Sequence, residues 1–281
     1  MRIKTVRHVF ELTGPLDLAA TLDCGQSFRW AECGGEPEQS AIGNRQSYVA
    51  VVEGETVRVC KQNGMLAVEC AGLPAEFWRD YFALDVDYDA LHGIFRKDAT
   101  LARCVDYARG IRVLRQPFFE TLVSFIISQN NNIPRIKGII KRLCENFGVP
   151  CGGTQFAFPS PEKLASLTPD DLACLRSGYR APAIIDAAKR VASRELDAAH
   201  LRAAPFEEAR KKLLKTYGVG PKIADCVLLF GLGRFEAFPI DVWMRRAMAE
   251  LFPDGLPESA APYAGIAQQY IFHYARTGAN L

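Results

Sequence analysis

The spacing of apolar residues changes near residue 115, and this change most constrains what the chain can fold into. Before it, apolar and polar residues alternate in four short segments, at residues 26–31, 48–52, 56–60 and 65–68. Alternation with a period of two is typical of strands that bury one face. Glycine-containing turns at residues 53–55 and 63–64 separate the last three segments, so we expect an antiparallel sheet.

Helical spacing begins after residue 115. Pro117 precedes a set of apolar residues placed three and four apart, namely Phe119, Leu122, Val123, Ile126 and Ile127. Proline is favoured in the first turn of a helix, and this spacing gives a helix one buried face. The same pattern follows Pro134 over residues 136–147, so two buried helices are predicted.

Further helix signals complete the fold class. Residues 73–88 predict a helix and a loop, and Ser160 and Thr168, each followed by a proline, supply capping oxygens for later helices. Together the patterns predict an α+β fold. It has an N-terminal antiparallel β-sheet region over residues 1–115 and a mainly α-helical domain over residues 116–281.

The composition is that of a globular chain. Its 281 residues are 49% hydrophobic and 23% charged, which is enough apolar material for two cores. No apolar run reaches the ~18 residues that a membrane helix needs, and the first residues lack the apolar segment of a signal peptide. We therefore expect a soluble, intracellular protein with no membrane partner.

Cysteine and histidine usage argues against disulfides and metals. The nine cysteines are scattered without a Cys-x-x-Cys pair, and the four histidines are equally dispersed. An odd number of scattered cysteines is typical of reduced thiols. No histidine stands at ligand spacing from a cysteine or carboxylate, so we predict no structural or catalytic metal.

The net charge of the chain does not indicate what kind of partner it binds. A net charge of +2 neither favours nor excludes a nucleic-acid partner. Arg135, Lys137, Lys141 and Arg142 form one basic cluster, and residues 210–212 form another. Solvated helix faces often carry such runs, so these clusters alone do not establish nucleic-acid binding.

Residues 213–225 carry the strongest chemical signal. They place a Gly-Val-Gly turn between two helical patterns, which is typical of a helix-hairpin-helix. Gly218 and Gly220 permit backbone angles closed to other residues, and with Val219 between them they leave N–H groups exposed at the start of the next helix. Such groups bind a phosphate in any sequence context. A plain helix corner is the alternative.

Lys222 stands in the first turn of the helix that follows the hairpin. A positive charge opposes the helix dipole there, so the position favours the neutral amine that a nucleophile needs. Nineteen residues later, Asp241 precedes another helical segment. Its carboxylate is either the cap of that helix or a partner of Lys222.

These residues resemble the helix-hairpin-helix DNA glycosylase superfamily, in which the hairpin is followed by a catalytic aspartate. Three further segments are similar to its 8-oxoguanine DNA glycosylase branch: Gly-Gln-Ser-Phe-Arg-Trp at residues 25–30, Leu-Asp-Val-Asp at residues 84–87 and Ser-Gln-Asn-Asn-Asn-Ile at residues 128–133. The resemblance covers nearly the whole chain. It implies a small sheet region followed by a helical helix-hairpin-helix glycosylase domain.

The resemblance implies a bifunctional DNA glycosylase/AP lyase of base excision repair that removes 8-oxoguanine from duplex DNA, preferably opposite cytosine. Lys222 would form a Schiff base whose β-elimination nicks the strand. Asp241, ionised beside a cation and a helix N-terminus, would stabilise positive charge on the sugar. Related branches bind an iron–sulfur cluster through cysteines after this aspartate, but no cysteine follows Cys226 here. No cofactor is implied.

The resemblance also implies a base-recognition pocket. The Gly25 carbonyl would accept from the extra ring N–H of the oxidised purine, Cys226 and Phe272 would stack on the base, and Gln268 would read its Watson–Crick edge. Gln268 and Phe272 are one helical turn apart, so one helix can present both. The alternatives are a turn glycine and ordinary core residues.

A second implied group faces the opposite strand. Asn130 would fill the gap left by the flipped base, Tyr179 would wedge the duplex, and Arg135 and Arg180 would read the widowed cytosine. Without the resemblance, these positions indicate only a turn and helix ends.

Two positions depart from the family pattern. Trp243 stands where relatives often place a histidine near the phosphate backbone, which puts that contact in doubt. Tyr217 stands where many hairpins have a proline before the first glycine, although tyrosine is compatible with the turn.

Two other functions fit the same residues. A non-catalytic helix-hairpin-helix module would bind DNA without turnover, and a glycosylase of the same fold would act on another lesion, such as an oxidised pyrimidine or alkylated purine. Under the main hypothesis the partner is double-stranded DNA containing 8-oxoguanine. We expect a monomer in the cytoplasm, associated with the nucleoid if the source is a bacterium.

Overall fold

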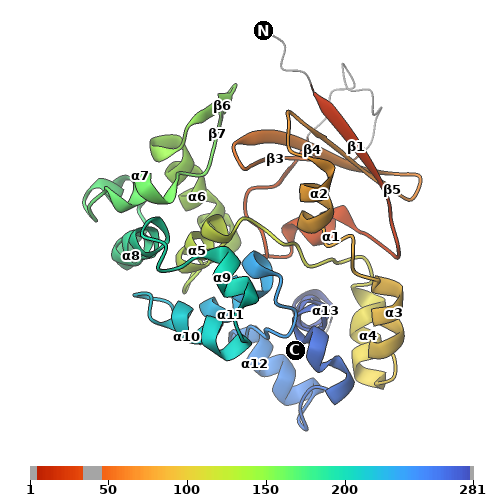
Figure 1. The fold of residues 1–281 in the computed structure, drawn as a ribbon. Helices are drawn as coiled ribbons and strands as arrows, with labels where there is room; N and C mark the ends of the chain where they lie inside the picture. The colour runs from red at the N-terminus through yellow and green to blue at the C-terminus, as the bar shows by residue number, and fades with distance from the viewer. Residues whose placement is uncertain (1–4, 34–45, 279–281) are drawn as a thin grey trace.

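The computed structural model describes residues 5–33 and 46–278. Its N-terminal part contains a five-stranded antiparallel sheet in the order β1-β5-β4-β3-β2 (Figure 1). The strands are β1 (Val6–Glu11), β2 (Ala31–Glu32), β3 (Ser47–Val52), β4 (Glu55–Gln62) and β5 (Met65–Cys70). The predicted antiparallel sheet is confirmed.

Two tight turns set the register of the central strands. Residues 53 and 54 have φ of 48° and 78°, and residues 63 and 64 have φ of 49° and 75°. Turns with positive φ at both positions match the twist of an antiparallel hairpin. β3 therefore pairs with β4, and β4 with β5, at the turns that the sequence indicates.

The strand predicted over residues 26–31 is wrong except at Ala31, which belongs to β2. Phe28 packs into the core of the helical part, whereas Trp30 packs into the core beneath the sheet. The apolar–polar alternation of residues 26–31 therefore arises because this loop buries Phe28 in one core and Trp30 in the other. The sequence also gives no clear sign of β1, because only one residue of this edge strand is buried.

Four helices also lie in the N-terminal part: α1 (Leu18–Asp23), α2 (Ala75–Tyr81), α3 (Tyr88–Phe95) and α4 (Ala99–Tyr107). The helix predicted within residues 73–88 is confirmed as α2. Sequence reasoning missed α3 and α4, although Asp87 and Asp98 cap their first turns with side-chain oxygens. α4 packs against the C-terminal helix α13 (Ala264–Thr277), and Figure 1 shows α3 and α4 on that side of the molecule.

The rest of the chain is mainly helical, as predicted. α5 (Phe118–Ile127) and α6 (Ile133–Phe147) lie where Pro117 and Pro134 indicate helices. The other helices are α7 (Pro161–Ala165), α8 (Ala181–Ala192), α9 (Ala198–Ala203), α10 (Phe206–Leu214), α11 (Pro221–Leu232) and α12 (Val242–Leu251), with short 3-10 helices η1 (Asp171–Leu175), η2 (Gly178–Arg180) and η3 (Glu258–Tyr263). A small hairpin, β6 (Pro150–Gly152) and β7 (Gln155–Phe156), follows α6.

Two large hydrophobic cores hold the described elements. One lies between the sheet and helices α1 and α2, around the fully buried Trp78. The other fills the helical part and includes Leu91 of α3 and Leu101 of α4. These two helices therefore pack with the helical part although they precede residue 115, and the domain boundary there stays a prediction.

A buried hydrogen bond joins α3 to α13. His92 Nε2 lies 2.9 Å from the hydroxyl of Tyr270, and that hydroxyl donates to the carbonyl of Ile111 at 3.2 Å. Because the hydroxyl proton is committed to Ile111, we assign the ring proton to Nε2, which donates to Tyr270. Burial, followed by the charge of nearby arginines, lowers the pKa of His92 to about 4. The ring is therefore neutral at neutral pH.

We predict that His92 makes the folded state less stable as the pH falls from 6.5 towards about 4. In the unfolded chain His92 has its ordinary pKa of 6.5, whereas its folded pKa is about 4, so the unfolded state binds a proton first. The difference corresponds to about 3 kcal/mol of unfolding free energy once both pKa values are passed. Urea unfolding at several pH values would measure it.

The matched variant is His92→Gln, which keeps an N–H donor for Tyr270 but does not titrate. Its stability should fall less than that of the natural protein over the same pH range. An equally steep fall in both proteins would show that His92 does not carry this dependence.

Candidate active site

The hairpin between α10 and α11 closes on Gly218. Its φ is 74°, and a Cβ at this position would lie 2.8 Å from the Cβ of Ala183 on α8, so only glycine fits without strain. Gly220 is different: its φ is −91°, and a Cβ at this position would meet no atom within 4 Å. The expectation that both glycines need unusual backbone angles is therefore wrong for Gly220, which is the N-cap of α11.

The hairpin leaves backbone donors available. Val219 is buried, and its N–H donates to the carbonyl of Thr216. Within residues 5–33 and 46–278, no group accepts a hydrogen bond from the N–H of Gly218 or Gly220. Free N–H groups beside the positive end of a helix dipole suit an anion, so the hairpin is equipped to bind one phosphate.

Lys222 has two neighbours at the end of α5. Its Nζ lies 3.4 Å from Ser128 Oγ and 5.0 Å from the ring centre of Phe125. Ser128 donates its own proton to the carbonyl of Phe125 at 2.7 Å, so its oxygen accepts from Lys222. Sequence reasoning missed both neighbours, because periodicity places Phe125 in a core and nothing in one sequence sets Ser128 opposite Lys222.

Cys226 lies one turn after Lys222 on α11 and is 3% exposed. Burial raises the pKa of its thiol to about 11, while the charge of Lys222 lowers it and the charges of Asp225 and Asp241 raise it. Cys226 is therefore a neutral thiol at neutral pH. Among the described residues no hydrogen bond or ion pair joins Lys222 to Asp241, so their joint role stays a prediction.

Asp241 is the N-cap of α12. Its Oδ1 accepts a hydrogen bond from the N–H of Met244 at 2.8 Å, so the capping role considered for it is confirmed. The side chain is half-buried. In the described part of the chain its second oxygen has no hydrogen-bond partner, which leaves one oxygen to face a positive charge.

Gly25 lies in the loop between α1 and β2 with φ of 94°. No N–H of the described residues reaches its carbonyl. The residues beside it are fixed: Gln26 Oε1 accepts from the N–H of Leu114 at 2.8 Å, and Cys24 Sγ lies 3.5 Å from Gln269 Oε1 on α13. Gly25 therefore has an available carbonyl on a well-anchored loop.

Gln268 and Phe272 lie one turn apart on α13, as the spacing indicates. Gln268 is 5% exposed, and its Oε1 accepts from Gln269 Nε2 at 2.6 Å, which connects it to the loop of Gly25. Phe272 is half-buried, with the Arg276 guanidinium carbon 5.8 Å from its ring centre. Among the described residues, no hydrogen bond or ring contact joins Phe272 to the other pocket candidates.

The three asparagines after α5 have different roles. Asn131 Nδ2 donates to the carbonyl of Ile127 at the end of α5, and Asn132 Oδ1 accepts a first-turn N–H of α6. Asn130 is exposed, has φ of 43°, and its Nδ2 lies 3.5 Å from the hydroxyl of Tyr179. The turn is thus held by two caps, and Asn130 is its exposed member.

Tyr179 and Arg180 are adjacent but differ in burial. Tyr179 is 60% exposed, whereas Arg180 is 3% exposed. The Arg180 guanidinium donates to the carbonyls of Gln129, Asn130 and Ser177, and its Cζ lies 4.5 Å from the Tyr179 ring centre. The structure therefore groups both residues with Asn130, but contact of Arg180 with a base requires it to exchange these carbonyl bonds.

Arg135 differs from the rest of its basic cluster. The other members, Lys137, Lys141 and Arg142, bind nearby carboxylates or a carbonyl. Arg135 is exposed, and its side chain makes no hydrogen bond or ion pair with the described residues. Arg135 is therefore the residue of this cluster whose guanidinium N–H groups are all available to a ligand.

Both departures from the family pattern are at the surface. Trp243 is 43% exposed, with the Arg246 guanidinium carbon 5.8 Å from its ring centre. Its indole N–H donates but does not titrate in the physiological range, unlike a histidine. Tyr217 is 63% exposed.

The described residues offer no metal cluster, disulfide or membrane-spanning helix. Among them, no three histidine, cysteine, aspartate or glutamate side chains lie close enough together to hold a metal ion. No disulfide joins the described cysteines. Outside residues 1–4, 34–45 and 279–281, no helix combines the length and apolar character that a bilayer crossing needs.

Two family models match adjoining parts of this chain. Residues 9–122 match the N-terminal domain of 8-oxoguanine DNA glycosylase, and residues 123–257 match the HhH-GPD superfamily of base excision DNA repair proteins.

Individual proteins are similar over most of the chain. The N-glycosylase/DNA lyase of Saccharomyces cerevisiae is 34% identical over 82% of this chain and 67% of its own. The probable N-glycosylase/DNA lyase of Methanothermobacter thermautotrophicus is 31% identical over 94% of each chain. The structure of Clostridium acetobutylicum 8-oxoguanine glycosylase/lyase with double-stranded DNA containing cytosine opposite 8-oxoguanine has a TM-score of 0.80 and 32% identity, covering 98% of this chain and 99% of that one.

We predict that Gly218→Ala destabilises the fold by about 1–3 kcal/mol, because the new Cβ combines strain at positive φ with overlap against Ala183. Gly220→Ala should cost much less, since its φ is ordinary and its surroundings are open. Urea unfolding of both variants measures the difference in unfolding free energy. Equal losses would contradict this account of the hairpin.

Proposed function

Because the chain belongs to the 8-oxoguanine DNA glycosylase family of the HhH-GPD superfamily, we propose that it excises 8-oxoguanine from duplex DNA and then cleaves the abasic strand. One observation carries the proposal. The amine of Lys222 lies at the start of the buried helix α11, 3.4 Å from Ser128 Oγ and one turn before Cys226.

Lys222 acts as the nucleophile. Its nitrogen bonds to C1′ of the damaged nucleoside while the glycosidic bond breaks, and the base leaves with the bonding electrons and takes up a proton. Opening of the sugar gives a Schiff base between Lys222 and C1′. Loss of a proton from C2′ expels the 3′ phosphate, and water then hydrolyses the imine. Ser128 accepts one N–H of Lys222 and so orients the amine.

Asp241 compensates the positive charge that develops on the sugar as the base departs. Its Oδ1 is held by the N–H of Met244, which leaves the second oxygen to face the sugar. A carboxylate fixed in this way stabilises the transition state without having to reorganise.

Base recognition uses hydrogen bonds with a backbone carbonyl and a side-chain amide, together with two side chains that stack on the base. The Gly25 carbonyl accepts from the extra ring N–H of 8-oxoguanine, Gln268 reads the Watson–Crick edge, and Cys226 and Phe272 stack on the base. The loss of one such hydrogen bond with normal guanine costs about 1–3 kcal/mol. That margin is small against the excess of normal bases, so easier flipping of the lesion also contributes.

Recognition of the opposite strand uses the second group of residues. Asn130 fills the gap and Tyr179 wedges the duplex, which is supported by their exposure and their contact with each other. Arg135 reads the widowed cytosine, as its exposed and unpartnered side chain permits. Arg180 joins it only after it gives up its carbonyl partners.

We place this activity in the cytoplasm, and at the nucleoid if the source is a bacterium, with the protein acting as a monomer. The support is chemical: duplex DNA is the substrate, and nine cysteines without a disulfide among the described ones suit a reducing compartment.

Borohydride trapping tests the proposal directly. With a duplex that carries 8-oxoguanine opposite cytosine, the natural protein should give a covalent adduct, because reduction freezes the Schiff base. Lys222→Gln should give none, since it lacks the amine. The same duplex with guanine in place of the lesion is the control. No adduct with either protein, despite tight binding, would instead support a non-catalytic DNA-binding module or another lesion.

Asp241→Asn separates charge from capping. Asparagine caps a helix about as well as aspartate, so the melting temperature should hardly change. Loss of the negative charge should lower the single-turnover rate of base release by roughly 10²–10³-fold. Single-turnover kinetics and thermal melting of the same sample measure both. A rate close to that of the natural protein would leave Asp241 as a helix cap and nothing more.

A further inference from the structure

One side chain outside the site holds the hairpin by its backbone. The N–H of Tyr217 donates to Asp186 Oδ2 on α8 at 2.8 Å. Among the described residues, no other side chain hydrogen bonds to the backbone N–H groups of residues 216–220. Asp186 is therefore a specific anchor of this turn.

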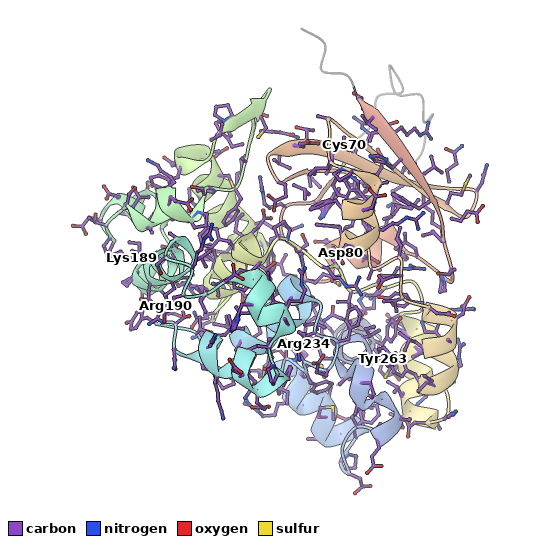
Figure 2. All side chains as sticks on the ribbon, in the orientation of Figure 1. Cys70, Asp80, Lys189, Arg190, Arg234 and Tyr263 are labelled. Carbon is purple, nitrogen blue, oxygen red and sulfur yellow. The ribbon has the colours of Figure 1, made fainter. Side chains whose placement is uncertain are left out.

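Asp186 is itself held in place from the other side. Arg190, one turn later on α8, donates from Nε to the same Oδ2 at 3.0 Å, and its Nη1 pairs with Glu195. Figure 2 labels Arg190 on α8. The side chains of Asp186 and Arg190 are 32% and 23% exposed, so water does not fully screen their pairing. Because the Asp186 carboxylate accepts hydrogen bonds from both Arg190 and the N–H of Tyr217, it has little freedom to rotate.

A second contact from α8 determines how closely the hairpin packs against this helix. Ala183 lies one turn before Asp186, and a Cβ on Gly218 would come within 2.8 Å of it. One face of α8 thus touches two successive hairpin residues, Tyr217 through a hydrogen bond and Gly218 through close packing. These contacts fix the turn while leaving the N–H groups of Gly218 and Gly220 without a partner in the described chain.

We propose that Asp186 is a positioning residue for DNA binding: it holds the hairpin so that the N–H groups of Gly218 and Gly220 bind one backbone phosphate, and it does not itself touch DNA. The inference rests on the proposed function, because it takes duplex DNA as the ligand. A carboxylate beside a phosphate ordinarily weakens binding by repulsion. Here Arg190 and the N–H of Tyr217 offset that charge, so the anchoring effect dominates.

The sign of the effect makes the proposal testable. Removing a negative charge from a DNA-binding surface should strengthen binding if only long-range electrostatics matter. Asp186→Ala should instead weaken binding about tenfold, because the turn loses the acceptor that holds the N–H of Tyr217. Asp186→Asn keeps an oxygen for the N–H of Tyr217 and should restore most of the affinity. Glu195→Ala removes an equal charge from the same Arg190 without touching the hairpin, and it is the matched control.

The measurement is fluorescence anisotropy with an undamaged duplex and with an 8-oxoguanine duplex, together with single-turnover base release at saturating protein. For Asp186→Ala we expect both Kd values to rise together while the saturated rate stays within about twofold. The proposal would be overturned if Asp186→Ala bound both duplexes as tightly as Glu195→Ala does, or more tightly. Base release is read separately, so failure of the natural protein to excise 8-oxoguanine would count against the proposed function, while the Kd comparison would still decide the role of Asp186.

Discussion

The burial of α11 on every side is the constraint on which the site depends. All residues from 223 to 232 are buried, so this helix cannot turn about its axis without exposing apolar surface or leaving voids in a close-packed interior. Even the acidic residue of the stretch, Asp225, is accommodated by an ion pair with Arg210 at 2.6 Å, as a buried charge requires. Packing consequently sets the directions of Lys222 and Cys226, and within residues 221–232 only the first two, at the N-terminal end of α11, are not buried.

In the proposed function, the sheet region contributes to the base-recognition pocket through one loop, that of Gly25. Gln26 is 1% exposed and bonds to the backbone of residues 112–114, which anchors the loop of Gly25 against the chain that enters α5. On the other side, His92 holds α13 through Tyr270, between the positions of Gln268 and Phe272. The pocket candidates thus come from three segments, and buried polar bonds fix two of them. Such bonds specify one arrangement because breaking them leaves unpaired groups in a dry interior.

Local patterns predicted more of the fold than of the site. The glycine turns, the helices after Pro117 and Pro134 and the cap of α12 depend on neighbours in sequence, and all are found. The strand predicted over residues 26–31 is wrong because Phe28 and Trp30 are buried in two different cores. Their burial produces the same apolar–polar alternation as a strand with one buried face. Ser128 and Phe125 as neighbours of Lys222, and the burial of Arg180, arise from contacts between distant segments. No periodicity encodes such contacts, so a single sequence cannot reveal them.

The residues proposed to face the opposite strand differ in how firmly the structure holds their side chains. The side chains of Asn130, Tyr179 and Arg135 are exposed. Arg180 instead holds three carbonyls, two of which belong to the turn that carries Asn130. Charge-assisted hydrogen bonds of this kind contribute about 1.5–3 kcal/mol each. In the proposed function, release of Arg180 towards a base must therefore be offset by comparable new bonds. Because this release also frees the turn of Asn130, the proposed gap filling and opposite-base reading are energetically linked.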